Sequence, residues 1–121
     1  MWRYEQSSGT IFHAADYIGM GYSGHGAGLN NPALEQVRDV GPIPKGIYDI
    51  GESEDVPHLG KNVMQLLPSA GTNDYGRTGF YWHGDDIHKP GEFCASDGCI
   101  VSSLAIRQLV STSNDSQLEV F

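Results

Sequence analysis

Glycine and proline interrupt this sequence at short intervals, and this limits how long any helix or strand can run. The chain has 16 Gly and 6 Pro among its 121 residues. Such punctuation favours many short strands joined by tight turns over long helices. At roughly 150 residues per domain, the length leaves room for one hydrophobic core. We therefore predict a single, mostly β domain that spans residues 1–121.

Several segments between the glycines and prolines have the residue composition of β-strands. Alternating or continuous apolar residues bounded by Gly or Pro indicate strands, and two prolines in a glycine-flanked turn make that turn rigid. The loop candidate is Gly19–Pro32, because it holds five glycines in fourteen positions. The predicted strands and their turns are Gly9–Ala15, Gly41–Gly46 leading into Ile47–Ile50, Val63–Leu67, Gly79–His83 and Gln117–Phe121.

One segment has the pattern of a helix, Leu104–Val110. Ser102 or Ser103 precedes it as a candidate N-cap. Ala105, Ile106, Leu109 and Val110 fall on one face at helical spacing, so we expect this face to pack on the core.

Net charge narrows the range of partners. Seven Lys and Arg against fifteen Asp and Glu give −8 at pH 7. This is the wrong sign for binding phosphate backbones or anionic lipid, so we expect no nucleic-acid partner and no membrane insertion. No apolar run approaches a membrane span, and Met1–Gln6 shows no Sec-type signal. The two cysteines leave the compartment open.

Cys94 and Cys99 admit structural explanations. A zinc site formed by His83, Asp85, His88 and one cysteine is conceivable, although these spacings are not the usual ligand pairs. A disulfide around the short loop between the cysteines is the other structural alternative.

A thiol nucleophile is the chemical alternative, and the segment Ser96–Val101 suits it. A cysteine nucleophile needs a nearby base, groups that favour its thiolate, and donors for the oxyanion that it creates. Gly98 permits a tight turn before Cys99, and the predicted helix begins shortly afterwards. His83, at the end of an aromatic strand, is the candidate base. Taken alone, this pattern is weak, because a cysteine before a helix is often plain core packing.

Several ordered motifs resemble one family. Gly79–Asp85 followed by Ser96–Ile100 resembles the His-Gly … Ser/Thr-x-Gly-Cys signature of YkuD-like L,D-transpeptidases. The sequence is more similar still to the branch that includes type VI secretion L,D-transpeptidase effectors. Further likeness lies in Tyr22–Gly24 with Gly28–Pro32, in Gly41–Tyr48 and in Gly76–Arg77, so the resemblance covers about residues 20 to 107.

The resemblance implies a compact β-sandwich or barrel with a short helix after a catalytic Cys99. It implies that His83 is the base, that Ser96, Asp97 and Gly98 support the oxyanion site, and that no metal or organic cofactor takes part. The implied substrate is a peptidoglycan tetrapeptide stem, cut after the L-centre of meso-diaminopimelate with release of D-Ala. Water would complete carboxypeptidase action, and an amine would complete cross-linking or exchange.

The same resemblance implies action in the bacterial periplasm after delivery by a secretion system, with a cognate immunity protein as a further partner. Release at lysis from a phage-encoded cell-wall enzyme is the alternative route. A catalytically silent peptidoglycan-binding module is the alternative function.

Two departures from typical cell-wall enzymes are Asp97 and Val101, which stand where those enzymes carry His and Arg. They place cross-linking in doubt more than trimming or exchange. Asp97 either orients His83 or caps the turn, and we favour the turn. Candidate substrate contacts are Arg77, for a stem carboxylate, together with Asp85 and Trp82.

Overall fold

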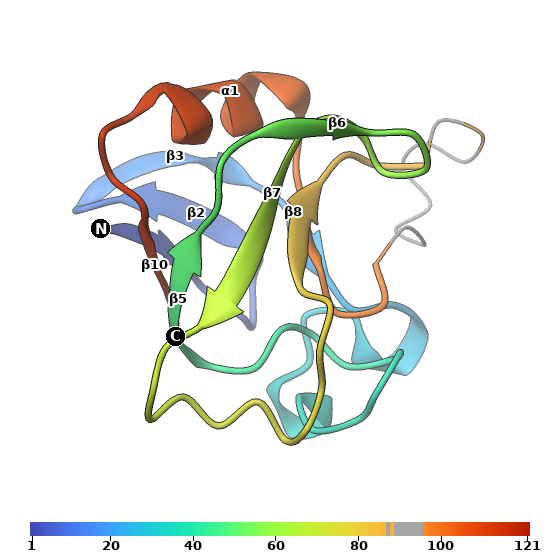
Figure 1. The fold of residues 1–121 in the computed structure, drawn as a ribbon. Coiled ribbons are helices and arrows are strands. Elements are labelled where there is room, and N and C mark those ends of the chain that lie inside the picture. Colours follow the sequence, from blue (N-terminus) through green and yellow to red (C-terminus); the bar gives the residue numbers. More distant parts are fainter. Residues whose placement is uncertain (87, 89–95) are drawn as a thin grey trace.

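The computed structural model of the protein describes residues 1–86, 88 and 96–121. Short strands dominate these residues and one α-helix lies across the sheet (Figure 1). The fold is therefore mostly β, as predicted. In chain order the elements are β1 (Trp2–Tyr4), β2 (Thr10–His13), β3 (Asp16–Met20), β4 (Tyr22–Ser23), the 3₁₀ turns η1 (Gly26–Gly28) and η2 (Pro32–Leu34), β5 (Gly46–Ile50), β6 (Glu54–Val56), β7 (Gly60–Pro68), β8 (Tyr81–His83), β9 (Ile100–Val101), α1 (Leu104–Thr112) and β10 (Gln117–Val120).

The strands form one mixed sheet that closes on itself. Its order is β3-β2-β1-β10-β5-β7-β8-β9-β4, and β6 pairs with β7 beside this path. The two end strands, β3 and β4, are separated in the chain only by Gly21. A Cβ on Gly21 would lie 2.3 Å from the carbonyl oxygen of Val101, so only glycine lets the chain pass this close to β9. Closure of this kind leaves few free strand edges.

Two parallel pairings interrupt an otherwise antiparallel sheet. β1 runs parallel to β10, which brings the two ends of the chain together. β8 runs parallel to β9, with His83 opposite Val101. The second pairing matters for function because it places the end of the aromatic strand beside the segment that follows Cys99.

The core fills the inside of this closed sheet. It includes both tryptophans, Trp2 and Trp82, with the fully buried Tyr4, Tyr48 and Leu118. The indole N–H of Trp82 donates to the buried Ser102 hydroxyl at 2.8 Å, so its one polar group is satisfied. No helix in the described part of the chain is long and apolar enough to cross a bilayer.

Most predicted elements occur, with shifted bounds. Gly46–Ile50, Gly60–Pro68, Tyr81–His83 and Gln117–Val120 are strands, and the hairpin of β2 and β3 turns at Ala14 and Ala15. The prediction for Gly19–Pro32 is wrong in part, because β3 continues to Met20 and β4 occupies Tyr22–Ser23.

The predicted helix is present but its buried face differs. Ser103 is the N-cap, and its hydroxyl accepts from the amide of Ile106. Val110 is buried as expected, whereas Leu109 is 53 % exposed. Arg107 is buried instead, because its guanidinium donates to the carbonyls of Lys61, Asn62 and Ser102 and joins the helix to β7.

Candidate active site

Cys99 lies in a turn directly before β9, with its side chain partly exposed. Its Sγ is 3.6 Å from the carbonyl oxygen of Gly79. Burial of the sulfur raises the pKa of Cys99 to about 11, and the carboxylate of Asp97 contributes in the same direction. The amide of Tyr81 and the guanidinium of Arg77 oppose this shift. The resting group is therefore a neutral thiol, and the expected lowering of its pKa does not occur.

His83 ends β8 and is 3 % exposed. Its Nδ1 lies 2.7 Å from the carbonyl oxygen of Gly84. Since a carbonyl oxygen only accepts, Nδ1 carries the proton and Nε2 is left with its lone pair. Burial lowers the pKa of His83 below its ordinary value, with a further contribution from the nearby Arg107 charge. His83 is thus a neutral imidazole of defined tautomer near pH 7, the form that a general base requires.

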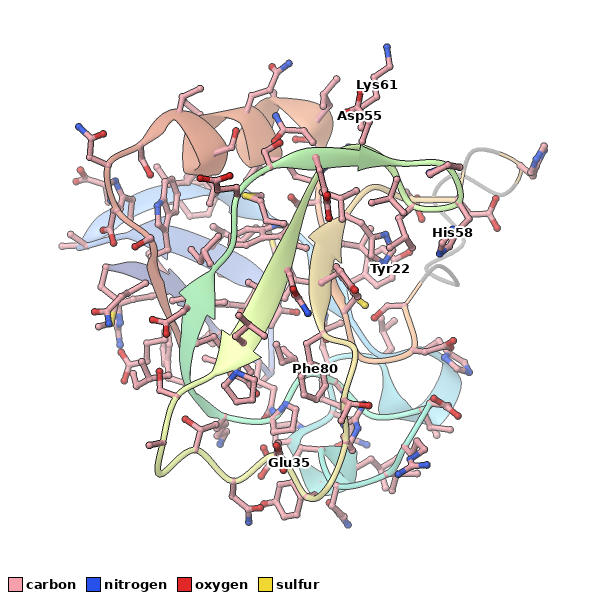
Figure 2. All side chains as sticks on the ribbon, viewed as in Figure 1. Tyr22, Glu35, Asp55, His58, Lys61 and Phe80 are labelled. Carbon is pink, nitrogen blue, oxygen red and sulfur yellow. The ribbon has the colours of Figure 1, made fainter. Side chains whose placement is uncertain are left out.

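Cys99 and His83 line one cavity of about 370 Å³, which we call the cysteine cavity. Its walls also include His58 and Leu59 from the β6–β7 hairpin and Arg38 and Asp39 from the loop before β5. Figure 2 shows His58 on that hairpin. The structure therefore brings the two predicted catalytic residues to one accessible hollow.

Ser96 holds the turn that carries Cys99. Its fully buried hydroxyl accepts from the amide of Gly24 at 2.9 Å and from the amide of Gly98 at 3.1 Å. The same hydroxyl donates to the carbonyl of Cys99 at 2.6 Å. One side chain thus joins the glycine-rich loop after β4 to both sides of the turn. The Gly98 amide is used in this contact. Of the backbone amides around Gly98 and Cys99 that were expected to form the oxyanion site, the Cys99 amide has no acceptor among the described residues, and its role as a donor stays a prediction.

Arg77 supports the same turn from the other side. It is 3 % exposed, and its guanidinium donates to the carbonyls of Pro42 at 2.8 Å, Gly41 at 3.0 Å and Asp97 at 3.2 Å, and to that of Glu35. Figure 2 places Glu35 near Phe80, at the end of the molecule away from α1. The side chain predicted to bind a stem carboxylate is therefore engaged with backbone carbonyls, which indicates a positioning role.

The sequence matches the Tlde1 domain over residues 18–119. The chain belongs to the Tlde1 domain family. This is a family of type VI secretion L,D-transpeptidase effectors, so the effector branch suggested by the sequence motifs is confirmed. The matched range contains Cys99, His83, Ser96 and Arg77.

Among solved structures, Bd1075 of Bdellovibrio bacteriovorus is similar, with a TM-score of 0.60 and 14 % sequence identity. The alignment covers all of this chain and 47 % of Bd1075, so the chain spans about half the length of that protein. At this identity the likeness establishes a shared fold. No curated protein matches the sequence.

The structure also gives the positions of Trp82 and Asp85, two residues that were predicted to contact the substrate. Trp82 is completely buried in the core, so its side chain has no surface to offer a substrate, and this prediction is wrong. Asp85 is half-buried next to the cavities, and its carboxylate accepts from the Tyr22 hydroxyl at 2.6 Å and from the Asp86 amide at 3.0 Å. Asp85 does not line the cysteine cavity, and its role as a substrate contact stays a prediction.

The Asp97 carboxylate contacts His25, and among the described residues no backbone amide of the turn donates to it, so the predicted cap is not seen there. Its side chain is 72 % exposed, and Oδ1 lies 3.3 Å from Nδ1 of His25. The same His25 nitrogen is 2.9 Å from the carbonyl oxygen of Ser96. No hydrogen bond between Asp97 and His83 occurs among the described residues. His25 therefore reaches the cysteine turn from the glycine-rich loop, a role that a lone loop histidine does not reveal in the sequence.

The described residues test one of the two structural alternatives for the cysteines, the zinc site, and do not test the other, the disulfide. Within the described residues, no three His, Cys, Asp or Glu side chains gather as metal ligands, so His83, Asp85 and His88 do not form the zinc site considered above. Cys94 lies outside the described residues, and the proposed Cys94–Cys99 disulfide stays a prediction.

Proposed function

We propose that this Tlde1 domain catalyses cysteine-dependent acyl transfer on peptidoglycan tetrapeptide stems. The observation that carries the proposal is the shared cavity of Cys99 and His83, with the His83 tautomer fixed by Gly84. A neutral thiol beside an imidazole with a free Nε2 is the resting form of a nucleophile and base pair. The family membership supports the same reaction class.

The first half of the reaction forms an acyl-enzyme. Nε2 of His83 takes the Cys99 proton as Sγ attacks the carbonyl carbon after the L-centre of meso-diaminopimelate. The Cys99 amide donates to the oxyanion of the tetrahedral intermediate. The C–N bond to D-Ala then breaks, and the imidazolium returns its proton to the departing amine. A thioester and free D-Ala result.

The second half resolves the thioester. Water attacks in carboxypeptidase action, whereas the amine of a free D-amino acid attacks in exchange. His83 accepts the proton of either nucleophile, and Cys99 leaves as the thiol. Because the resting thiol has a raised pKa, proton transfer accompanies attack instead of preceding it.

We further propose that the domain acts as an antibacterial effector in the periplasm of a target bacterium, with a cognate immunity protein as its inhibitor. The effector family supports delivery into that compartment.

A silent peptidoglycan-binding module is the second candidate. It is favoured by the position of the Cys99 Sγ, which lies 3.6 Å from the Gly79 carbonyl oxygen and makes no hydrogen bond with His83 among the described residues. Mass spectrometry of tetrapeptide muropeptides incubated with wild type and with Cys99→Ala separates the two, with free D-Met in parallel tubes. Loss of D-Ala, or its replacement by D-Met, in the wild-type tubes alone supports acyl transfer. Unchanged muropeptides with folded wild type overturn it in favour of the binding module.

A further inference from the structure

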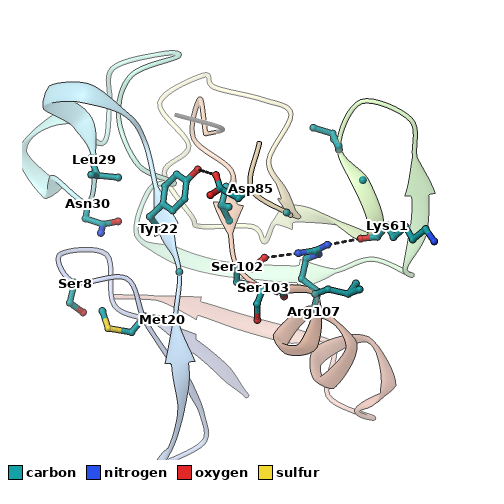
Figure 3. A pocket seen from close by; sticks show the side chains of 16 residues that line it. Ser8, Met20, Tyr22, Leu29, Asn30, Lys61, Asp85, Ser102, Ser103 and Arg107 are labelled. Atoms are coloured by element: carbon teal, nitrogen blue, oxygen red, sulfur yellow. Dashed lines mark hydrogen bonds between the residues drawn. The ribbon is translucent and has the colours of Figure 1, made fainter. Parts of the chain in front are cut away.

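A cavity larger than the cysteine cavity lies beside the cysteine site and not at it. This distal cavity measures about 910 Å³ and opens between the β3–β4 segment and the start of α1 (Figure 3). Met20 and Leu29 form one wall, and Ser103 and Leu104 form the other. Met20 is 54 % exposed and Leu104 is 41 % exposed. Exposed apolar side chains at the mouth of a large hollow are typical of a binding site.

The distal cavity and the cysteine cavity are linked by shared lining residues. Between them lies a middle cavity of about 410 Å³, which shares His58, Leu59 and His83 with the cysteine cavity. The middle cavity shares Leu59, Gly60, Gly84 and Asp85 with the distal one. The three cavities thus follow one another along the surface from Cys99 past His83 to the distal cavity, in the order that an extended ligand held at Cys99 would need.

The distances along this path are short. Cys99 lines the cysteine cavity and Val101 lines the distal cavity, and β9 separates them by two residues. At the rise of a strand this is about 7 Å. The three stem residues that precede the cleaved bond span roughly 10 Å when extended. The sugar that bears the stem then reaches the distal cavity.

The chemistry of the distal cavity suits an uncharged ligand. Three charged residues line it, and two of them already have partners: Asp85 accepts from the Tyr22 hydroxyl, and Arg107 donates to backbone carbonyls. Figure 3 shows both interactions as dashed lines. The ammonium group of Lys61 has no hydrogen-bond or ion-pair partner among the described residues. A second stem peptide, with several free charges, would find few opposite charges to pair with.

Hydrogen-bonding groups stand at the margin of the apolar walls. The side-chain oxygen Oδ1 of Asn30 accepts from the Tyr4 hydroxyl and from the Ser23 amide. The side-chain NH₂ group of Asn30 has no acceptor among the described residues. Ser8 and Ser103 add hydroxyls to the lining. N-acetylated sugars present the matching combination of apolar ring faces, hydroxyls and amides.

We propose that the distal cavity is a glycan subsite, which binds the uncharged N-acetylated disaccharide that carries the stem peptide. This inference rests on the proposed acyl transfer at Cys99 for the identity of the substrate. It makes the domain selective for disaccharide-linked stems over free stem peptides.

The test compares two ligands by calorimetry on Cys99→Ala, a free tetrapeptide and the same tetrapeptide on its disaccharide. We expect the disaccharide form to bind about tenfold more tightly, a modest gain for one occupied subsite. Leu104→Glu and Met20→Glu in this background bring the ratio of the two affinities toward one. Leu109→Glu and Tyr17→Glu are matched controls, since they change equally exposed apolar residues of α1 and β3 outside the cavity, and they keep the ratio.

Three results overturn the glycan subsite: equal affinities for the two ligands, no binding of either, or an unchanged ratio in Leu104→Glu and Met20→Glu. Binding of two free tetrapeptides per chain also overturns it, because a second stem then occupies the cavity. Turnover by wild type is measured alongside. An affinity ratio without any turnover supports the subsite while refuting the proposed reaction, so the two failures are distinguishable.

Discussion

The guanidinium of Arg77 occupies the space that a side chain on Gly98 would need. A Cβ on Gly98 would lie 2.3 Å from Nη2 of Arg77, and the φ of Gly98 is 126°, a value that favours glycine. The residue before Cys99 is therefore a glycine for two reasons, backbone conformation and the closeness of a buried cation. Arg77 in turn fixes the loop around Gly41 and the carbonyl of Asp97.

Arg77→Lys tests this positioning role. A lysine ammonium cannot match the four carbonyl contacts of the planar guanidinium. We expect a loss of about 3 kcal/mol in the free energy of unfolding, the usual scale for breaking a buried charged network. Thermal unfolding measures the change, and kcat is expected to fall with it.

The control is Arg38→Lys, because Arg38 is exposed and lines the same cysteine cavity. Its stability is expected to stay within about 0.5 kcal/mol of wild type. If Arg77→Lys instead raises KM at unchanged stability, Arg77 binds substrate and the positioning role is wrong.

Ser96→Ala removes the hydroxyl that joins the glycine-rich loop to the cysteine turn. The amides of Gly24 and Gly98 then lose their common acceptor. Each unsatisfied buried amide costs about 1–3 kcal/mol, so we expect a clear drop in melting temperature and at least a tenfold fall in kcat/KM. Ser111→Ala is the matched control, since the Ser111 hydroxyl bonds only within α1. Wild-type activity in Ser96→Ala would show that the turn holds without this hydroxyl.

The sequence was sufficient to predict most strands and to select Cys99 and His83, which the structure places in one cavity and whose catalytic roles stay a prediction. The strands at Val63–Leu67 and Gly79–His83 could be predicted because each segment is an apolar run bounded by Gly or Pro. This pattern is contained within the segment itself. The start of α1 could be predicted from Ser103, because a serine before an amphipathic segment is a local N-cap signal. Cys99 and His83 emerged from motif spacing, and the parallel pairing of β8 with β9 explains why that spacing brings them to one cavity.

The buried face of α1 and the position of β4 depend on contacts between segments that are distant in the sequence. Arg107 follows Ile106 on a helix whose apolar pattern pointed to Leu109, yet carbonyls of Lys61 and Asn62 at the start of β7 make the arginine the buried residue. Strand β4 could not be predicted within the glycine-rich segment, because β4 forms by pairing with β9, which lies almost eighty residues later. No local pattern carries such information.

Alkylation of Cys99 by iodoacetamide is expected to be slow at neutral pH. With the pKa raised to about 11 by burial, about one thiol in ten thousand is ionised at pH 7. The rate should therefore rise about tenfold per pH unit from pH 7 to 10. Mass spectrometry of the Cys99 peptide measures it. A rate that levels off near pH 7 and drops in His83→Ala would mean that the resting pair is thiolate and imidazolium, contrary to the structure.

The acid limb of kcat/KM is expected to follow His83. The base acts in its neutral form, so activity falls as pH drops through the His83 pKa and the proton occupies Nε2. Burial, and then the charge of Arg107, lower this pKa, so the midpoint of the limb lies below the ordinary 6.5. A pH series of D-Ala release from tetrapeptide muropeptides measures it. His58→Gln, which removes an exposed histidine of the same cavity, should leave the midpoint in place. A limb above pH 6.5, or one that disappears in His58→Gln, would assign the proton transfer to a different group.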